Sequence, residues 1–200
     1  MKALLVTFLA VCSFIAASAQ DTDKVKELEL RVQKLEEQVA KLERNAESGR
    51  QIPQVKNMMK IARQHVESER KNFKSGDITK AEEIYQKASR ILGGNEAEKL
   101  LDSVVSLYPQ LNRAGCAQLY LAQQEKGQEK ERLLKDCMER FSGCYYLDGA
   151  QVGPLAMLQL AYYYQQTGRE HEARKLFKQL RHESPEAIGH DGELLVDEIE

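Results

Sequence analysis

Apolar residues recur at steps of three and four along most of the chain, a pattern that predicts helices. The clearest example lies between Pro154 and Pro185, where two apolar stripes flank Gly168. The stripes contain Leu155, Leu158, Ala161 and Tyr162 before the glycine, and Ala173, Phe177 and Leu180 after it. Gly168 permits a chain reversal and Pro185 ends the second helix, so this stretch is predicted to be a helical hairpin. A hairpin this short cannot bury its own apolar faces, which indicates neighbours of the same kind.

Two earlier hairpins follow the same pattern, with turns at Gly93 and Gly127. These two turns are 34 residues apart, and the next turn, at Gly168, follows after 41. The longer interval contains what we interpret as an insertion, Ser142–Gly153, rich in glycine and aromatic residues. The acidic end of the chain, Asp191–Glu200, is predicted to be a helix that caps the stack. The expected fold class is all-α, with a solenoid of about three helical hairpins over residues 54–200.

Residues 20–48 carry a heptad pattern that predicts a coiled coil and hence a homo-oligomer. The seam consists of Val25, Leu28, Val32, Leu35, Val39 and Leu42. Valine at a and leucine at d favours a dimer by the general rule, but Arg31–Glu36 resembles the short trimerisation motif of parallel coiled coils. A trimer is therefore favoured over a dimer, and a single helix folded back on the hairpins is the alternative. Residues 49–53 contain a glycine and a proline and are predicted to be a linker.

The first residues, 1–19, have the pattern of a secretory signal peptide, with cleavage expected between Ala19 and Gln20. The apolar run is shorter than the ~20 residues that span a bilayer, so removal is favoured over a membrane anchor. Cys12 lies in a segment that resembles a bacterial lipobox, and membrane attachment is expected only if this cysteine is lipidated. The protein is therefore predicted to be exported, to the periplasm or cell envelope of a bacterium.

Composition and motifs narrow the function classes further. The net charge is −2 and basic residues are spread along the chain, so nucleic acid is not an expected partner. No two histidines have metal-ligand spacing, and the sequence has no glycine-rich phosphate loop and no nucleophile elbow. We therefore predict no catalytic residue, no metal and no cofactor, and we expect that the protein is not an enzyme.

Three cysteines, Cys116, Cys137 and Cys144, remain after the signal peptide is removed. A disulfide needs Cα atoms about 5.5–6 Å apart, which neighbouring helices reach only at a close contact. Because a loop cysteine adapts more readily, Cys116–Cys144 is the preferred pair and Cys116–Cys137 the second. Three buried free thiols are the remaining alternative.

The third hairpin resembles tetratricopeptide (TPR) repeats, which have small residues where helices approach and aromatic residues between them. The matching positions are Ala161, Tyr164, Gly168, Ala173, Phe177 and Pro185. The first hairpin matches at fewer positions and the middle one is degenerate. The order of signal peptide, coiled coil and repeats resembles, in layout only, the periplasmic cell-division coordinator family associated with the Tol–Pal system.

This resemblance implies a concave face built from the first helix of each hairpin, suited to an extended peptide. On this chain the implied face consists of Ala117, Leu121, Gln124, Leu158, Tyr162, Gln165 and Gln166. We therefore expect an exported scaffold or adaptor that binds protein or peptide partners in the cell envelope. A TPR lipoprotein of envelope or outer-membrane assembly and an accessory factor of cell-wall remodelling are the alternatives.

Overall fold

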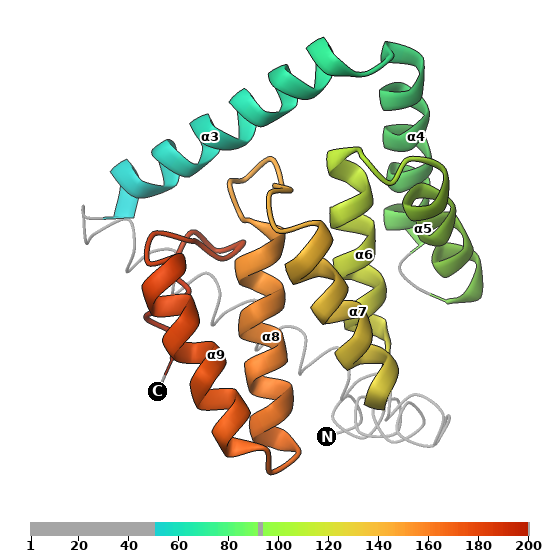
Figure 1. Cartoon of the computed structure of the whole chain (residues 1–200). Helices are drawn as coiled ribbons and strands as arrows, with labels where there is room; N and C mark the ends of the chain where they lie inside the picture. The colour runs from blue at the N-terminus through green and yellow to red at the C-terminus, as the bar shows by residue number, and fades with distance from the viewer. Residues whose placement is uncertain (1–50, 92–93, 200) are drawn as a thin grey trace, which may run out of the picture. The chain divides into compact units, whose positions relative to one another are not determined.

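The computed structural model describes residues 51–91 and 94–199 (Figure 1). The predicted signal peptide, the coiled coil with its seam, and Cys12 lie outside the described residues. The first described helix, α3, begins at Gln51, so residues 51–53 of the predicted linker 49–53 are helical; residues 49 and 50 lie outside the described part. Pro53 is accommodated because it lies in the first turn of this helix, where a missing N–H costs little.

All the regular structure in the described part of the chain is helical, which confirms the all-α fold class. The seven helices there are α3 (Gln51–Asn72), α4 (Ser75–Ile91), α5 (Asn95–Leu107), α6 (Asn112–Gln124), α7 (Gly127–Arg140), α8 (Val152–Gln166) and α9 (Glu170–Glu183). The described residues also contain two isolated β-bridges, Tyr145 with Gln151 and Ile188 with Leu194.

The helices from α4 to α9 form three hairpins stacked in chain order as an α-solenoid (Figure 1). The second helix of each hairpin packs against the first helix of the next, and the first helices α4, α6 and α8 also contact one another. The tight turns contain Gly94, Gly127 and Gly168, with φ of 87°, 59° and 76°. Glycine adopts this left-handed backbone without a steric penalty, which explains the reversals that the sequence predicts.

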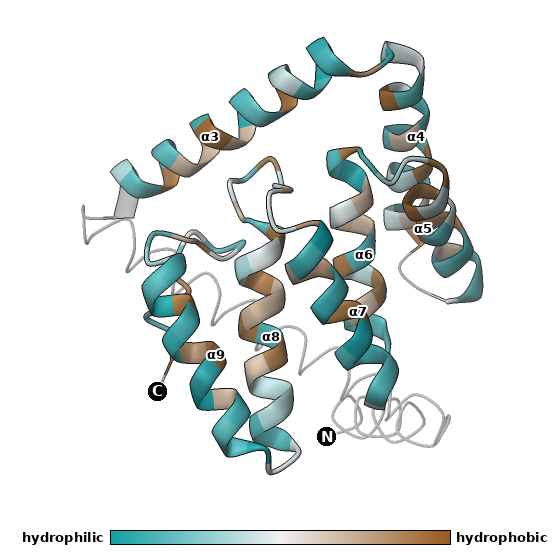
Figure 2. Cartoon of the chain, viewed as in Figure 1, coloured by the Kyte–Doolittle hydropathy of each residue, from teal (hydrophilic) through white to brown (hydrophobic). Residues whose placement is uncertain are grey.

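One continuous apolar core runs through the stack. Tyr164 and Phe177 of the third hairpin are both buried, as the resemblance to TPR repeats implies. Helix α8 lies between its neighbours and is buried along most of its length, because it is apolar on nearly every side. In Figure 2 the visible sides of α7 and α9 are largely hydrophilic, as expected for helices with one face toward solvent.

Helix α3 does not join the stack but lies across the segments that connect the hairpins (Figure 1). A Cβ added at Gly149 would come within 2.9 Å of the backbone of Met58 and Met59, so helix and loop touch directly. At Gly192 the added Cβ would lie 3.1 Å from Val55. Helix α3 therefore packs on two glycine-containing segments, with its backbone against Gly149 and with the Val55 side chain against Gly192.

The stretch Ser142–Gly153, interpreted from the sequence as an insertion, contains the first of two copies of the same turn. We call residues 144–152 the first Asp-Gly turn and residues 187–195, 43 positions later, the second. In the first, Val152 N donates to Cys144 O at 2.9 Å; in the second, Leu195 N donates to Ala187 O at 2.9 Å. The prediction of an acidic helix over Asp191–Glu200 is wrong, because the described residues 191–199 contain no helix and the second turn fills their start.

The two turns also share their aspartate. Asp148 Oδ1 accepts a hydrogen bond from Ala150 N at 3.0 Å, and Asp191 Oδ1 accepts one from Glu193 N at 3.0 Å. In each case the following glycine has positive φ, which is why the pair Asp-Gly recurs. The same turn thus follows the second hairpin, after α7, and the third hairpin, after α9.

Candidate peptide-binding groove

Helix α4 has an open side that α6 and α8, the first helices of the two later hairpins, lack. Helices α6 and α8 are each covered by the second helix of the preceding hairpin, whereas α3 crosses the turns and makes no comparable packing with α4. Side chains on this side of α4 are exposed and follow helical spacing: Thr79, Glu83, Gln86, Lys87 and Arg90. The stripe is mostly polar, so it suits a ligand with hydrogen-bonding groups better than another apolar helix face.

A cavity of about 580 Å³ lies at the N-terminal end of this stripe. Its apolar lining includes Val66 of α3, Ile78 of α4 and Leu111 before α6, while Leu147 of the first Asp-Gly turn stands at its edge, 57% exposed. A second hollow of about 420 Å³ continues along α4 toward Ile91 and shares Glu82 and Glu83 with the first. We call the two together the α4 groove.

The α4 groove has the length of a short extended peptide. From Ser75 to Ile91 the helix rises about 24 Å at 1.5 Å per residue. A peptide with a rise of about 3.3 Å per residue would cover it with about seven residues. Apolar groups gather at one end and polar groups along the rest, so an apolar anchor followed by a polar segment fits best.

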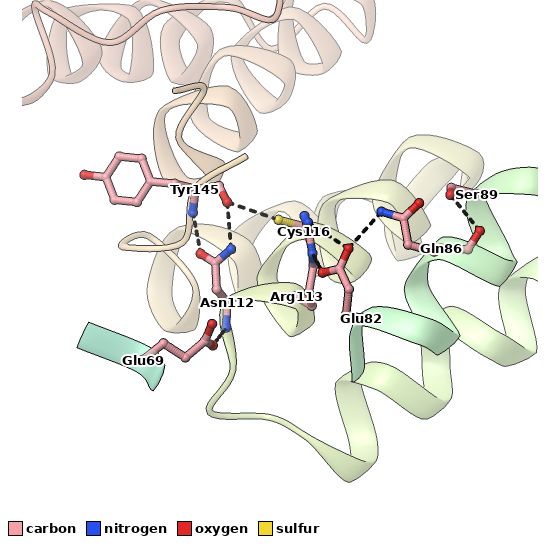
Figure 3. A network of polar contacts seen from close by, with 8 residues as sticks. All are labelled: Glu69, Glu82, Gln86, Ser89, Asn112, Arg113, Cys116 and Tyr145. Atoms are coloured by element: carbon pink, nitrogen blue, oxygen red, sulfur yellow. Dashed lines mark hydrogen bonds and ion pairs between the residues drawn. The ribbon is translucent and has the colours of Figure 1, made fainter. Parts of the chain in front are cut away.

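An ion pair on the wall of the groove holds α4 and α6 together (Figure 3). Arg113 donates two hydrogen bonds to Glu82, one of them from Nη2 to Oε1 at 3.1 Å, and its guanidinium lies 4.9 Å from the centre of the Tyr85 ring. Burial alone would raise the pKa of Glu82, but hydrogen bonds from Arg113 and Gln86 outweigh it and lower that pKa. Glu82 is therefore ionised at neutral pH and fixes the guanidinium.

A second set of contacts fixes α3 to the rest of the groove (Figure 3). Glu69 Oε1 accepts a hydrogen bond from the backbone N of Asn112 at 2.5 Å, so a side chain of α3 satisfies a free N–H at the start of α6. The Asn112 amide in turn bonds both the N and the O of Tyr145, each at 2.7 Å. No sequence pattern singles out Glu69 or Asn112, because their contact joins residues 43 positions apart.

The peptide-binding face implied by the TPR resemblance is not a continuous surface. Ala117, Leu121 and Leu158 are buried in the core, because α6 and α8 are enclosed by their neighbours. Gln124, Gln165 and Gln166 are exposed. Tyr162 is half-buried, and its hydroxyl donates to the backbone O of Glu198. Among the first helices of the three hairpins, α4 has the open side, rather than α6 or α8.

The three cysteines are free thiols, and neither predicted disulfide is formed. Cys116 and Cys137 are buried in the core, and the Cys116 thiol lies 3.6 Å from the backbone O of Tyr145. Cys144 packs against Gly115, where an added Cβ would lie 2.6 Å from the Cys144 Cβ. Burial raises the pKa of Cys116 to about 12 and that of Cys144 to about 11, so few thiolates form at neutral pH.

Within residues 51–91 and 94–199, no group of three or more His, Cys, Asp or Glu side chains is placed to hold a metal ion. None of the helices in those ranges is long and apolar enough to cross a bilayer. No family model, curated protein or solved structure matches the chain. The likeness to TPR proteins therefore stays a prediction made from the motif, and the fold class is established by the helix packing alone.

Proposed function

We propose that this protein is an exported oligomeric scaffold that binds extended segments of partner proteins in the α4 groove. The predicted signal peptide directs export, and the predicted coiled coil gathers several copies. Clustered grooves would then engage several segments at once, and such avidity exceeds single-site affinity by ~100-fold or more.

The observation that carries this proposal is the open polar side of α4. Every later first helix in the stack is covered, whereas this side of α4 offers a continuous groove that ends in an apolar cavity. Amide and hydroxyl groups at Gln86 and Thr79 suit the backbone of an extended segment, and the cavity suits one large apolar side chain. Charges of both signs, at Glu83, Lys87 and Arg90, would select among polar residues that follow the anchor.

Peptide selection with a matched pair of variants tests this proposal. Random peptides displayed on phage are selected on the full-length protein, and the affinities of the selected peptides are measured for Leu147→Glu and Leu107→Glu. Both leucines are exposed, at 57% and 65%, so neither substitution removes a core residue. Only Leu147 lines the cavity, and a charge there should lose about 1–2 kcal/mol of apolar contact, roughly tenfold in affinity.

Leu107→Glu should bind the same peptides as the unmodified protein does. If both variants lose affinity equally, or if neither does, the selected peptides do not bind in the α4 groove and the proposal is wrong. Light scattering on the mature chain tests the oligomer separately, and a monomer at micromolar concentration would remove the avidity argument.

A further inference from the structure

Helix α3 is attached to the stack through turns rather than through the core. Met58 and Ala62 of this helix are buried, but they lie outside the core cluster that α4 to α9 share. The helix contacts Gly192 through Val55 and Gly149 through Met58 and its neighbour. The core cluster of the stack is therefore built from α4 to α9 and the segments that follow them, and α3 packs outside it.

The link between α3 and α4 is two residues long, Phe73 and Lys74. Phe73 N still donates to Glu69 O at 3.0 Å, and α4 begins at Ser75, so these two residues are the only non-helical backbone between the helices. If both became helical, α3 and α4 would form one helix over residues 51–91, and α3 would point away from its own stack. Short links of this kind favour exchange of an element between identical chains.

We propose that α3 is exchanged between copies of this chain, so that α3 of one copy occupies the seat on another. The seat consists of the two Asp-Gly turns and the start of α6 at Asn112. An exchanged helix makes the same contacts that it makes in its own chain, so exchange costs little free energy. The proposal uses the proposed function in one respect, since the predicted coiled coil directly before α3 would hold the copies close together.

Exchange would make each α4 groove a composite of two chains. Val66 and Arg70 of α3 line the cavity, and Glu69 caps the helix whose first residues form its floor. One chain would therefore supply α4 and α6, and a second copy would supply the opposite wall. Partner binding would then require the oligomer for the completeness of each site as well as for avidity.

Cysteine cross-linking between two different chains tests the exchange. Gln54 of α3 donates from Nε2 to the backbone O of Glu186 at 3.0 Å, so the two positions are adjacent when α3 is in the seat. Gln54→Cys is placed in a full-length chain with an affinity tag and Glu186→Cys in an untagged full-length chain. The two are coexpressed and mildly oxidised, and mass spectrometry identifies the chains that each disulfide joins.

Exchange predicts a disulfide between tagged and untagged chains at a yield several-fold above a matched control. In the control, the tagged chain carries Arg63→Cys instead, at an exposed position half a helical circumference away on α3, which measures random collisions within the oligomer. A flexible four-residue insertion after Lys74 should lower the interchain yield, because a longer link lets α3 reach its own seat.

An interchain yield no higher than that of the Arg63→Cys control overturns the exchange. The same holds if a chain carrying both Gln54→Cys and Glu186→Cys cross-links only within itself. If either of these outcomes is found while light scattering shows a trimer or dimer, the exchange is wrong but the proposed function is unaffected. Loss of peptide binding in the Leu147→Glu test bears on the groove and leaves the cross-linking result unaffected.

Discussion

The contact between α3 and Gly149 allows a quantitative test, because the chain contains a matched glycine without such a contact. Gly149 and Gly168 both have positive φ, 99° and 76°. Alanine at either position strains the backbone by about 1–2 kcal/mol, partly offset by the lower entropy of the unfolded chain. Gly168→Ala adds a Cβ into open space, so we expect a net loss of about 1 kcal/mol of unfolding free energy.

Gly149→Ala adds a steric term to the same strain. Its Cβ would lie 2.9 Å from Met58 C and Met59 N, which are helix backbone atoms that cannot move aside singly. The whole helix must shift, and overpacking of this kind costs typically 1–3 kcal/mol. We therefore expect Gly149→Ala to lose about 2–4 kcal/mol in total, clearly more than the control.

Urea unfolding followed by circular dichroism measures both losses, and hydrogen exchange locates them. In Gly149→Ala the amides of α3 should exchange faster than in the unmodified protein, while those of α9 should change only with global stability. In Gly168→Ala no such difference should arise at α3. Equal losses for the two variants, within about 0.5 kcal/mol, would show that α3 does not press on the first Asp-Gly turn.

Three further predictions concern polar contacts. Glu69→Ala should lower the unfolding free energy by about 1–3 kcal/mol, because the N–H of Asn112 loses its partner, whereas Glu69→Gln should cost less than half as much; urea unfolding of both variants checks this. His190 Nδ1 and Asp148 Oδ2 are 2.8 Å apart, and this hydrogen bond raises the pKa of His190. The stabilisation that the protonated His190 gives to the fold is therefore fully present below about pH 6.5 and is lost as the pH rises through the pKa of His190 in the folded protein. The unfolding free energy that His190→Gln removes should therefore be larger at pH 5 than at pH 8.5. The pKa of Glu131 falls to about 2, since hydrogen bonds from neighbouring Lys, Tyr and Arg side chains outweigh the effect of burial. The stabilisation that the ionised Glu131 gives to the fold is therefore present above about pH 4.3 and is lost toward pH 2. Between these pH values the unfolding free energy of Glu131→Gln, measured with urea, should depend less on pH than that of the unmodified protein.

The sequence predicts the hairpins because their signals are local. Apolar spacing around Gly127 and Gly168 fixes both the helices and the reversals between them. The repeat of the Asp-Gly turn was not predicted, since residues 144–152 and 187–195 share little beyond their Asp-Gly pair. That pair, followed 43 residues later by a second one, is the signal that could have found it.

The site was harder to predict, because periodicity identifies apolar positions without saying which helix face another element covers. The four consecutive apolar residues of α8 from Leu155 to Leu158 indicate a helix buried on all sides, and this run is the signal that could have excluded Leu158 from the predicted peptide-binding face. The open side of α4 depends on the path of α3, which is set by contacts such as Glu69 with Asn112, far apart in the sequence. No local pattern encodes that path.

The crossing of α3 over the two Asp-Gly turns sets a limit on how the solenoid can grow. From Val55 at the second Asp-Gly turn to Glu69 at the start of α6, the helix advances about 21 Å at 1.5 Å per residue. The length of α3 thus matches the distance across two hairpins. A duplicated hairpin would increase that distance, so α3 would have to gain residues to keep both contacts.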